Sequence, residues 1–334
     1  MFYKNEEGYI VLLKDVLEGG ETKITRNGEV LSQFGHMIEF DCISELFPLI
    51  TTKKVFFRGI VEELLWFLRG STNANELKNK NVNIWNGNSS RAYLDSVGLS
   101  NYAEGELGPV YGWQWRKFGK QYKASKEDKE DKEDKEDKED KEDKEDNDVV
   151  DHSISIDSIE NSEHIVRGYD QLKFVLTELL KDNNSRRAVL SAWNPCDLNK
   201  MALPPCHILY IFNKTNDGLC CHLTLRSSDL FLGLPFNIAS CALLTIIIAH
   251  VLHINASKIC LSICDAHIYA EHIEQVKKQI ELEIYNSPKV IINKTPLHLD
   301  SSIEEKIEWI EKLSYEDFEL INYKSHNRLN ALMK

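Results

Sequence analysis

The spacing of apolar residues along the chain predicts a few helices and several short strands. Two segments, 57–70 (FRGIVEELLWFLRG) and 169–182 (YDQLKFVLTELLKD), repeat apolar residues at helical intervals. Runs rich in β-branched and aromatic residues predict strands at 36–40, 187–193, 207–213, 220–227, 258–264 and 289–293. Because helices and strands do not alternate regularly, we expect an α/β protein of the α+β type, in which helices cover a mixed β-sheet.

A long segment without Asp, Glu, Lys or Arg, 230–257, has two interpretations. Its length and its ALLTIIIAHVL run suggest a membrane span, which requires about 20 apolar residues. Five residues interrupt it, however, and leave a shorter strongly apolar part: Pro235, Asn237, Ser240, His250 and His253. We therefore expect a helix buried in a protein core.

A low-complexity tract of seven Lys-Glu-Asp triplets occupies 126–146. Each triplet contributes −1 to the net charge of −13, so the rest of the 334-residue chain carries only −6. A three-residue repeat gives no apolar stripe on a helix, and we expect disorder or a solvated helix there. The mildly acidic remainder does not suggest a nucleic-acid partner, which needs a basic face, but it can still bind a small anion.

The chain has eight cysteines and begins without the basic and apolar segments of a secretory signal. We expect free thiols in a reducing compartment, the cytoplasm, with entry into the nucleus left open. Cys260, Cys264, His267 and His272 lie close together in sequence and suggest a metal site. The alternation of KICLSICDAHIY is typical of a strand, however, and no paired CxxC spacing occurs, so we expect no metal.

Three clusters of polar residues carry candidate chemistry. Cys206 follows two prolines at the start of a predicted strand, where a nucleophilic thiol can be held rigidly. Arginines that lower the pKa of such a thiol occur in LRSSDLFLGLPFN and in NSRRAVLSAWN. His267 and Tyr269 lie two residues apart at the end of another strand and thus face the same side. Together the clusters suggest a pocket for a phosphate and a sugar around a thiol.

Long motifs in a characteristic order make the chain resemble the thymidylate synthase family over nearly its whole length. They are FPLITTKKVFFRGIVEELLWFLRGSTNA, NIWNGNSSRAYLDSVG, GELGPVYGWQWRKFG, SRRAVLSAWNP, MALPPCH, RSSDLFLGLPFNIASCALL and DAHIY. The resemblance implies the thymidylate synthase fold in a single domain, 1–334, interrupted by an acidic insert at about 124–165. SSRAYLDSVGL is closer to eukaryotic members, and with no reductase domain in this sequence we expect a monofunctional form.

In this family dUMP is methylated to dTMP, a step of de novo dTTP synthesis, with 5,10-methylenetetrahydrofolate as co-substrate and neither metal nor nicotinamide. By resemblance Cys206 attacks C6 of the uracil, and Asn237 pairs with the edge of the base. The implied catalytic residues are Cys206, Glu63, Tyr111, Asn237, Asp229 and Arg226. The implied dUMP-binding residues are Arg26, Arg186, Arg187, His207, Arg226, Ser227, Ser228, Asp229, Asn237, His267, Ile268 and Tyr269.

The folate side is also assigned by resemblance, to Ile84, Trp85, Leu203, Asp229, Leu232, Gly233, Phe236 and Met333. The family implies a homodimer whose sheets pack face to face, with Arg186 and Arg187 donated to the partner's site. Helical periodicity alone does not choose between Glu62 and Glu63 as the carboxylate that faces the pocket.

The chain departs from the family pattern near Arg26, where NGEVLSQFGH replaces a Thr-Gly-Thr-Gly run, and at its end, where LNALMK carries a lysine. The family's terminal tail closes over the folate and excludes water. Poor closure favours a pyrimidine hydroxymethylase, because water then captures the methylene intermediate. Trp85 argues for methylation, and Asn237 argues for uracil as the base, which leaves a deoxyuridylate hydroxymethylase as the alternative. An inactive homologue with an RNA-binding or regulatory role is a third possibility, which the complete set of matched residues disfavours.

Overall fold

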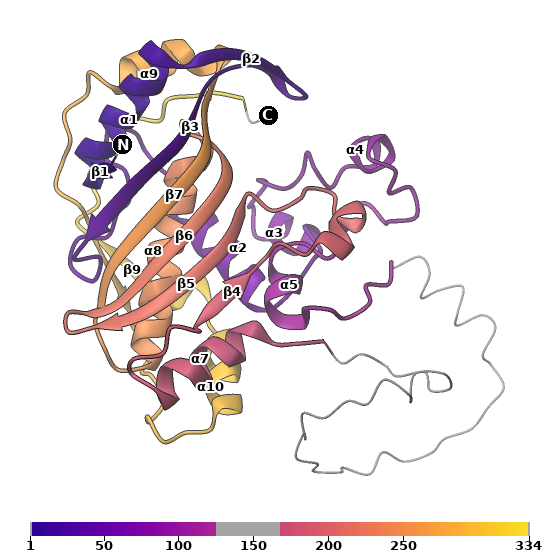
Figure 1. The fold of residues 1–334 in the computed structure, drawn as a ribbon, viewed down its shortest axis with the longest axis vertical. Coiled ribbons are helices and arrows are strands. Elements are labelled where there is room, and N and C mark those ends of the chain that lie inside the picture. Colours follow the sequence, from indigo (N-terminus) through magenta and orange to yellow (C-terminus); the bar gives the residue numbers. More distant parts are fainter. Residues whose placement is uncertain (1, 125–167, 333–334) are drawn as a thin grey trace.

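The computed structural model describes residues 2–124 and 168–332, so the Lys-Glu-Asp tract lies outside the described residues. A seven-stranded sheet forms the centre of the fold (Figure 1). Its strands are β1 (Phe2–Lys4), β2 (Glu21–Thr25), β3 (Gly28–Asp41), β4 (Val189–Ser191), β5 (His207–Thr215), β6 (Gly218–Asp229) and β7 (Ala256–Tyr269). A separate antiparallel pair consists of β8 (Lys289–Ile292) and β9 (Phe318–Ile321).

The sheet is mixed, as the sequence predicted. Its order is β1-β3-β7-β6-β5-β4, with β2 also paired to β3. The β1–β3 and β6–β7 pairs are parallel, and the other pairs are antiparallel. The parallel β6–β7 pair requires a crossover, which the long central helix α8 (Gly233–Val251) provides.

The other α-helices are α1 (Asn5–Gly19), α2 (Phe57–Leu68), α3 (Asn75–Lys78), α4 (Arg91–Ser96), α5 (Gly112–Lys117), α7 (Gln171–Lys181), α9 (Ile273–Gln279) and α10 (Ile303–Glu311). Short 3₁₀ turns are η2 (Pro195–Lys200), η3 (Ala270–His272) and η4 (Tyr315–Asp317). Both predicted helices and all six predicted strands are confirmed. β3 and β7 extend beyond their predicted ends, into the stretches 28–35 and 265–269, where polar residues and glycines are more frequent.

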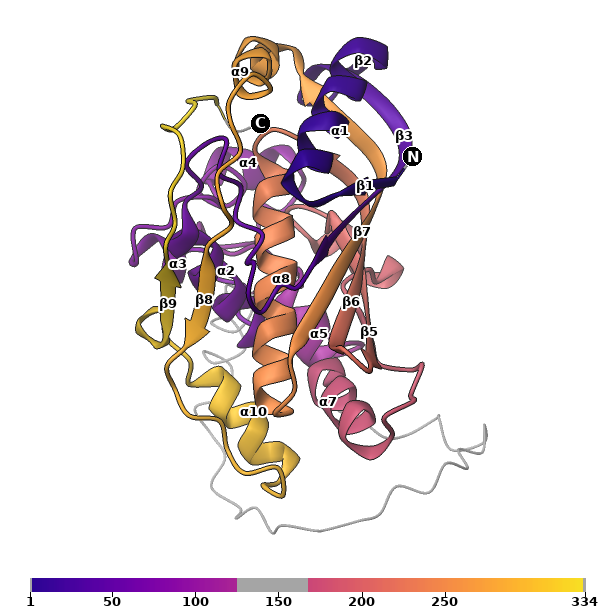
Figure 2. The same cartoon turned by 90° about the vertical axis from the view of Figure 1, so that its left-hand side faces the viewer.

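The uncharged segment forms the core helix α8, which the side view shows between the sheet and the β8–β9 pair (Figure 2). It is the one helix among the described residues that is long and apolar enough to cross a membrane, but 83% of its apolar window is buried inside the protein. Its central turns are apolar on nearly every face because protein surrounds them on nearly every side.

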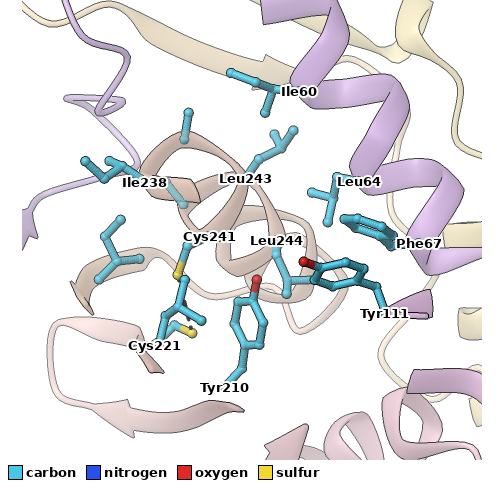
Figure 3. Close-up of a cluster of buried hydrophobic side chains, with 14 of the residues drawn as sticks. Ile60, Leu64, Phe67, Tyr111, Tyr210, Cys221, Ile238, Cys241, Leu243 and Leu244 are labelled. Carbon is cyan, nitrogen blue, oxygen red and sulfur yellow. Dashed lines mark hydrogen bonds between the residues drawn. The ribbon is translucent and has the colours of Figure 1, made fainter. Parts of the chain in front are cut away.

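The core lies between α2, α8 and one face of the sheet (Figure 3). The buried side chains that meet there are Ile60, Leu64, Phe67, Tyr111, Tyr210, Cys221, Ile238, Cys241, Leu243 and Leu244. The opposite face of the sheet keeps a row of partly exposed side chains on β6 and β7, including His222, Ser262 and Cys264. Phe34 on β3 is 79% exposed. One face of the sheet is thus packed and the other is open.

The burial of α8 can be tested with two adjacent isoleucines. Ile247 is fully buried, whereas Ile246 is only half-buried. Ile247→Ala should lower the free energy of unfolding in urea by about 2–5 kcal/mol, because it leaves a cavity in the core. Ile246→Ala should cost clearly less. Equal losses in the two variants would contradict this packing of the helix.

Candidate active site

The candidate residues meet at one end of the sheet, where β5 begins and where β6 and β7 end (Figure 1). The backbone N–H of Arg226 on β6 donates to the carbonyl of Cys206, 3.0 Å away. Asp229 at the end of β6 lies opposite His267 on β7. The register of three strands therefore brings the thiol, an arginine, a carboxylate and a histidine to one edge.

The guanidinium of Arg226 holds the segment that precedes the thiol. Its Nε donates to the carbonyl of Pro205 and its Nη2 to that of Pro204, both at 2.8 Å. The same Nη2 lies 3.7 Å from the Sγ of Cys206. Burial raises the pKa of this half-buried thiol, while Arg226 and Tyr111 lower it in part. Arg226 thus lowers the pKa of Cys206, as expected, but within one chain this effect is smaller than the rise that burial causes.

Tyr111 contacts the backbone of Cys206 through its hydroxyl group. Its hydroxyl accepts a hydrogen bond from the backbone N–H of Cys206 at 2.9 Å. Its ring stacks on Phe67 and on His207, with centroids 4.9 and 4.3 Å away. Burial raises its pKa well above the ordinary value, so the phenol stays protonated. The backbone of Tyr111 is strained at φ 27°, and these ring contacts hold it in place.

The structure separates the two glutamates of α2 that the sequence left undecided. Glu62 is buried and forms an ion pair with Lys80 at 2.6 Å. Glu63 instead accepts a hydrogen bond from Nε1 of Trp85 at 2.7 Å. Burial raises the pKa of Glu63 to about 7, although the Trp85 bond lowers it. Trp85 in turn packs edge-on against Tyr111, so Glu63 is the carboxylate that belongs to the site.

The first turns of α8 present a partly exposed face to this end of the sheet. Leu232, Gly233, Phe236 and Asn237 are all half-buried, and their spacing of four residues places them on one side of the helix. Ile84 and Leu203 are likewise partly buried against the core. An amide and several apolar side chains are therefore partly accessible at the start of the helix that follows β6.

The residues expected to bind the sugar form a hydrogen-bonded group at the ends of β6 and β7. Nδ1 of His267 lies 2.8 Å from Oδ1 of Asp265 and 3.4 Å from the hydroxyl of Ser227. Tyr269 packs edge-on against His267. Burial raises the pKa of Tyr269, an effect that Asn27 and Arg26 partly offset. Arg26, in the exposed β2–β3 turn, therefore lies close enough to influence this group.

Asp229, opposite His267 at the end of β6, lies next to this hydrogen-bonded group. Its Oδ1 accepts from the backbone N–H groups of Phe231 and Leu232 at 2.9 and 3.3 Å. Its Oδ2 lies 3.8 Å from Nδ1 of His272. The carboxylate thereby fixes the turn that leads into α8.

Some predicted residues lie behind the site. His207 is buried, its Nδ1 is 3.0 Å from the hydroxyl of Tyr210, and burial lowers its pKa to about 3. Ile268 is fully buried, and the buried hydroxyl of Ser228 has no hydrogen-bond partner among the described residues. Met333 lies outside the described residues.

The arginine pair lies at the opposite end of the sheet. Arg186 and Arg187 are exposed and precede β4, which pairs antiparallel with β5 so that Val189 faces Ile211. Arg187 therefore stands near Asn213, about seven residues and roughly 23 Å along β5 from Cys206. Its Nε is 3.2 Å from Glu178 on α7. The chain does not bring this pair to its own thiol.

Three contributing residues were missed as site candidates. Asp265 orients His267, Trp193 lies under the guanidinium of Arg226 at 5.9 Å, and Lys53 is buried beside Asp229. Asp265 stood in the DAHIY cluster and was recognisable there. No spacing signal marks Trp193 or Lys53, which reach the site through tertiary packing.

The suggested metal cluster does not form. In residues 2–124 and 168–332, no three His, Cys, Asp or Glu side chains are arranged to hold a metal ion.

The raised pKa of Glu63 gives a test that is independent of catalysis. The folded protein binds this proton more tightly than the unfolded chain, so stability should fall as the pH rises from about 4.5 to about 7. Between pH 5 and pH 8 this group should cost up to about 3 kcal/mol, and Glu63→Gln should abolish that loss in urea unfolding. Glu7→Gln, at an exposed position, is the control. An unchanged pH profile in Glu63→Gln would refute the shift.

Comparison with known proteins places this geometry in a family. A family model described as thymidylate synthase matches residues 7–334. Human thymidylate synthase is 40% identical over 326 residues, which cover 97% of this chain and 89% of the human protein. Thymidylate synthase 1/2 of Encephalitozoon cuniculi is 38% identical and covers 98% of this chain and 97% of that protein.

Other relatives are longer. A bifunctional dihydrofolate reductase-thymidylate synthase of Paramecium tetraurelia is 40% identical over 98% of this chain. This chain spans 61% of that protein and 51% of an Arabidopsis thaliana relative with the same description. The match covers nearly every described element, including the strands and helices that form the site. The chain belongs to the thymidylate synthase family.

Proposed function

We propose that this protein methylates dUMP reductively to dTMP, with 5,10-methylenetetrahydrofolate as the donor of carbon and hydride and with dihydrofolate as the second product. The observation that carries this proposal is the thiol of Cys206, held beside the guanidinium of Arg226 and next to the hydroxyl of Tyr111, which accepts from the backbone N–H of Cys206. Within this family, such a thiol acts on a pyrimidine. The activity would serve de novo dTTP synthesis.

The first step is the addition of the Cys206 thiolate to C6 of the uracil. A new S–C6 bond forms, the C5–C6 double bond opens, and negative charge moves towards O4. Asn237 on α8 supplies an amide that donates to O4 and accepts from N3. Arg226 stabilises the thiolate and can share the phosphate of dUMP with Ser227. Tyr269 and His267 would hold the 3′-hydroxyl of the deoxyribose.

The folate would supply a one-carbon unit to C5 and then a hydride. Once C5 is bonded to that carbon, it must lose its proton while the bond between the carbon and the folate nitrogen breaks, which leaves an exocyclic methylene on the base and tetrahydrofolate as the hydride donor. Glu63, with a pKa near 7, is suited to accept this proton directly or through water, and Tyr111 completes the network. After hydride transfer, the S–C6 bond breaks and the thiolate of Cys206 is restored.

We assign the flat aromatic co-substrate to the apolar side chains of Trp85, Leu232 and Phe236, together with Asp229 at the turn that leads into α8. Apolar surroundings of this kind would exclude water from the reacting carbon, which separates methylation from hydroxymethylation.

We also infer a homodimer in which Arg186 and Arg187 serve the partner's site. Two observations support it. The pair stands roughly 23 Å along β5 from its own thiol. The open sheet face carries Phe34 at 79% exposure, the kind of apolar surface that a second copy would cover. The donated charges would also lower the pKa of Cys206, which burial raises within one chain.

We propose the cytoplasm as the location. All eight cysteines are free thiols, and the Sγ atoms of Cys221 and Cys241 remain unbonded at 3.8 Å. A reducing compartment keeps them so. Fractionation of cells followed by detection of the protein would test this.

The activity should be measured as dihydrofolate formation from dUMP and methylenetetrahydrofolate, followed spectrophotometrically. Cys206→Ala should lose at least about 10³-fold in kcat because no S–C6 bond can form, while dUMP binding stays within a few-fold. Cys196→Ala, which removes an exposed cysteine elsewhere, is the matched control. A hydroxymethylase would consume both substrates without making dihydrofolate, and an inactive homologue would consume neither. Either result would contradict the proposal.

The shared site is tested by complementation. Two inactive parents, Cys206→Ala and the double variant Arg186→Ala/Arg187→Ala, are unfolded together in equal amounts and refolded. Random pairing makes about half of the dimers mixed, and in each of these one site is intact. Activity should therefore return to about one quarter of the wild-type value. A mixture as inactive as its parents would show that the arginines act within their own chain.

A further inference from the structure

His272 is a fully buried histidine that no step above uses. It ends η3 and leads into α9. Its Nε2 lies 2.8 Å from the carbonyl oxygen of Leu332, and its Nδ1 lies 3.8 Å from Oδ2 of Asp229. The ring packs against Phe231 and Tyr269, with centroids 5.5 Å away in both cases. It thus contacts the C-terminal segment, the carboxylate at the folate side and the tyrosine at the sugar side.

The two ring nitrogens have defined roles. The carbonyl of Leu332 can only accept, so Nε2 must carry a hydrogen. A neutral ring would then direct the lone pair of Nδ1 at the carboxylate of Asp229. The protonated ring instead places an N–H there, at a distance that fits a charge pair rather than a hydrogen bond. The geometry therefore favours the imidazolium.

The surrounding charges agree with this assignment. Burial and the nearby ammonium of Lys53 lower the pKa of His272, but the contacts with Asp229 and Leu332 outweigh them and raise it overall. Lys53 is itself buried, donates to the carbonyl of Phe231, and has its pKa lowered by burial to about 7. Tyr269 and Tyr9 are the other titratable groups close to His272 and Asp229, and burial raises the pKa of each.

The C-terminal segment reaches His272 along a short series of contacts. The hydroxyl of Tyr323 donates to the carbonyl of Ile50 at 2.9 Å, and the backbone N–H of His326 donates to the carbonyl of Thr51 at 2.9 Å. Leu329 and Ala331 then pack against the core. Both ribbon views place this segment near the end of the sheet that carries Cys206 (Figures 1 and 2). The bond to His272 involves Leu332, the last residue that the structure describes.

We propose that His272 is a positioning residue that ties the C-terminal segment to Asp229 and so fixes the folate side of the pocket. The assignment rests on the proposed function for its catalytic consequence, but the tie itself is a property of the free protein. It predicts that losing the imidazole weakens folate use far more than dUMP use. It also predicts that the tie weakens as the pH rises through the raised pKa of His272.

The test uses three variants of the whole chain. His272→Phe keeps a ring against Phe231 and Tyr269 but has no N–H. His272→Gln keeps a donor for Leu332 but has no positive charge. His250→Phe is the matched control, since His250 also bonds a carbonyl through Nε2, to Lys294 at 3.0 Å, and stacks on Trp309 away from the site.

Steady-state kinetics give the first readout. His272→Phe should raise KM for methylenetetrahydrofolate about tenfold or more while KM for dUMP stays within about twofold. His272→Gln should recover part of this loss but should not show the rise of the folate KM that the wild type shows as the pH passes through the raised pKa of His272. His250→Phe should match the wild type. The proposal would be overturned if the KM values for methylenetetrahydrofolate and dUMP rose in parallel. It would also be overturned if His272→Gln kept the pH dependence of the folate KM seen in the wild type.

Release of C-terminal residues by carboxypeptidase Y, followed by mass spectrometry on the free protein, gives a readout that needs no activity. His272→Phe should lose residues up to Leu332 several-fold faster than the wild type and His250→Phe, with His272→Gln between them. Equal rates in all four proteins would refute the tie. If the wild type makes no dihydrofolate but the four proteins still differ in this way, the proposed function is wrong, whereas the contact between His272 and the C-terminal segment is supported. Tryptophan fluorescence and dUMP binding confirm that each variant is folded.

Discussion

The structure of the site depends on one guanidinium, that of Arg226. Two of its N–H groups bind the carbonyls of Pro204 and Pro205, and its backbone N–H binds the carbonyl of Cys206. Prolines have no backbone N–H to donate, so their carbonyls are the only polar groups through which this segment can be held. Because Arg226 lies on a central strand, the thiol takes its position from the register of the sheet rather than from a loop. The same side chain then remains 3.7 Å from the sulfur as its nearest charge.

Burial of the ionisable groups in the pocket disfavours their charged forms. Burial raises the pKa of Cys206, of Glu63 and of Tyr111, so each is held in its uncharged form more strongly than in water. For Glu63 the result is useful, since a pKa near 7 suits a group that exchanges protons at neutral pH. For Cys206 it is not, and more positive charge is needed to form the thiolate. The arginine pair of a second chain would supply that charge, which links assembly to nucleophile activation.

Much of this was predictable from the sequence, for physical reasons that differ between elements. The strands were found because a half-buried strand alternates, and α8 was found because a helix surrounded by protein is apolar on all faces. The motifs that resemble the family could be matched residue by residue to Cys206, Asn237 and Arg226. The choice between Glu62 and Glu63 could not be made, because the two are adjacent on one helix. It is decided by Lys80 and Trp85, which come from a separate loop.

The least predictable part is the network around Asp229, and the reason is general. His272 and Lys53 lie in segments far apart in sequence, and neither forms a local pattern with the carboxylate. Their proximity to Asp229 becomes apparent only in the folded chain, where α9, the loop before α2 and the C-terminal segment meet at the end of β6. A half-buried carboxylate beside two buried bases costs free energy unless the charges balance. Phe231 contributes its carbonyl to Lys53, its N–H to Asp229 and its ring to His272, and so holds all three groups in register. In that arrangement the three charged groups are coupled. A change of charge on Asp229, His272 or Lys53 shifts the pKa values of the other two.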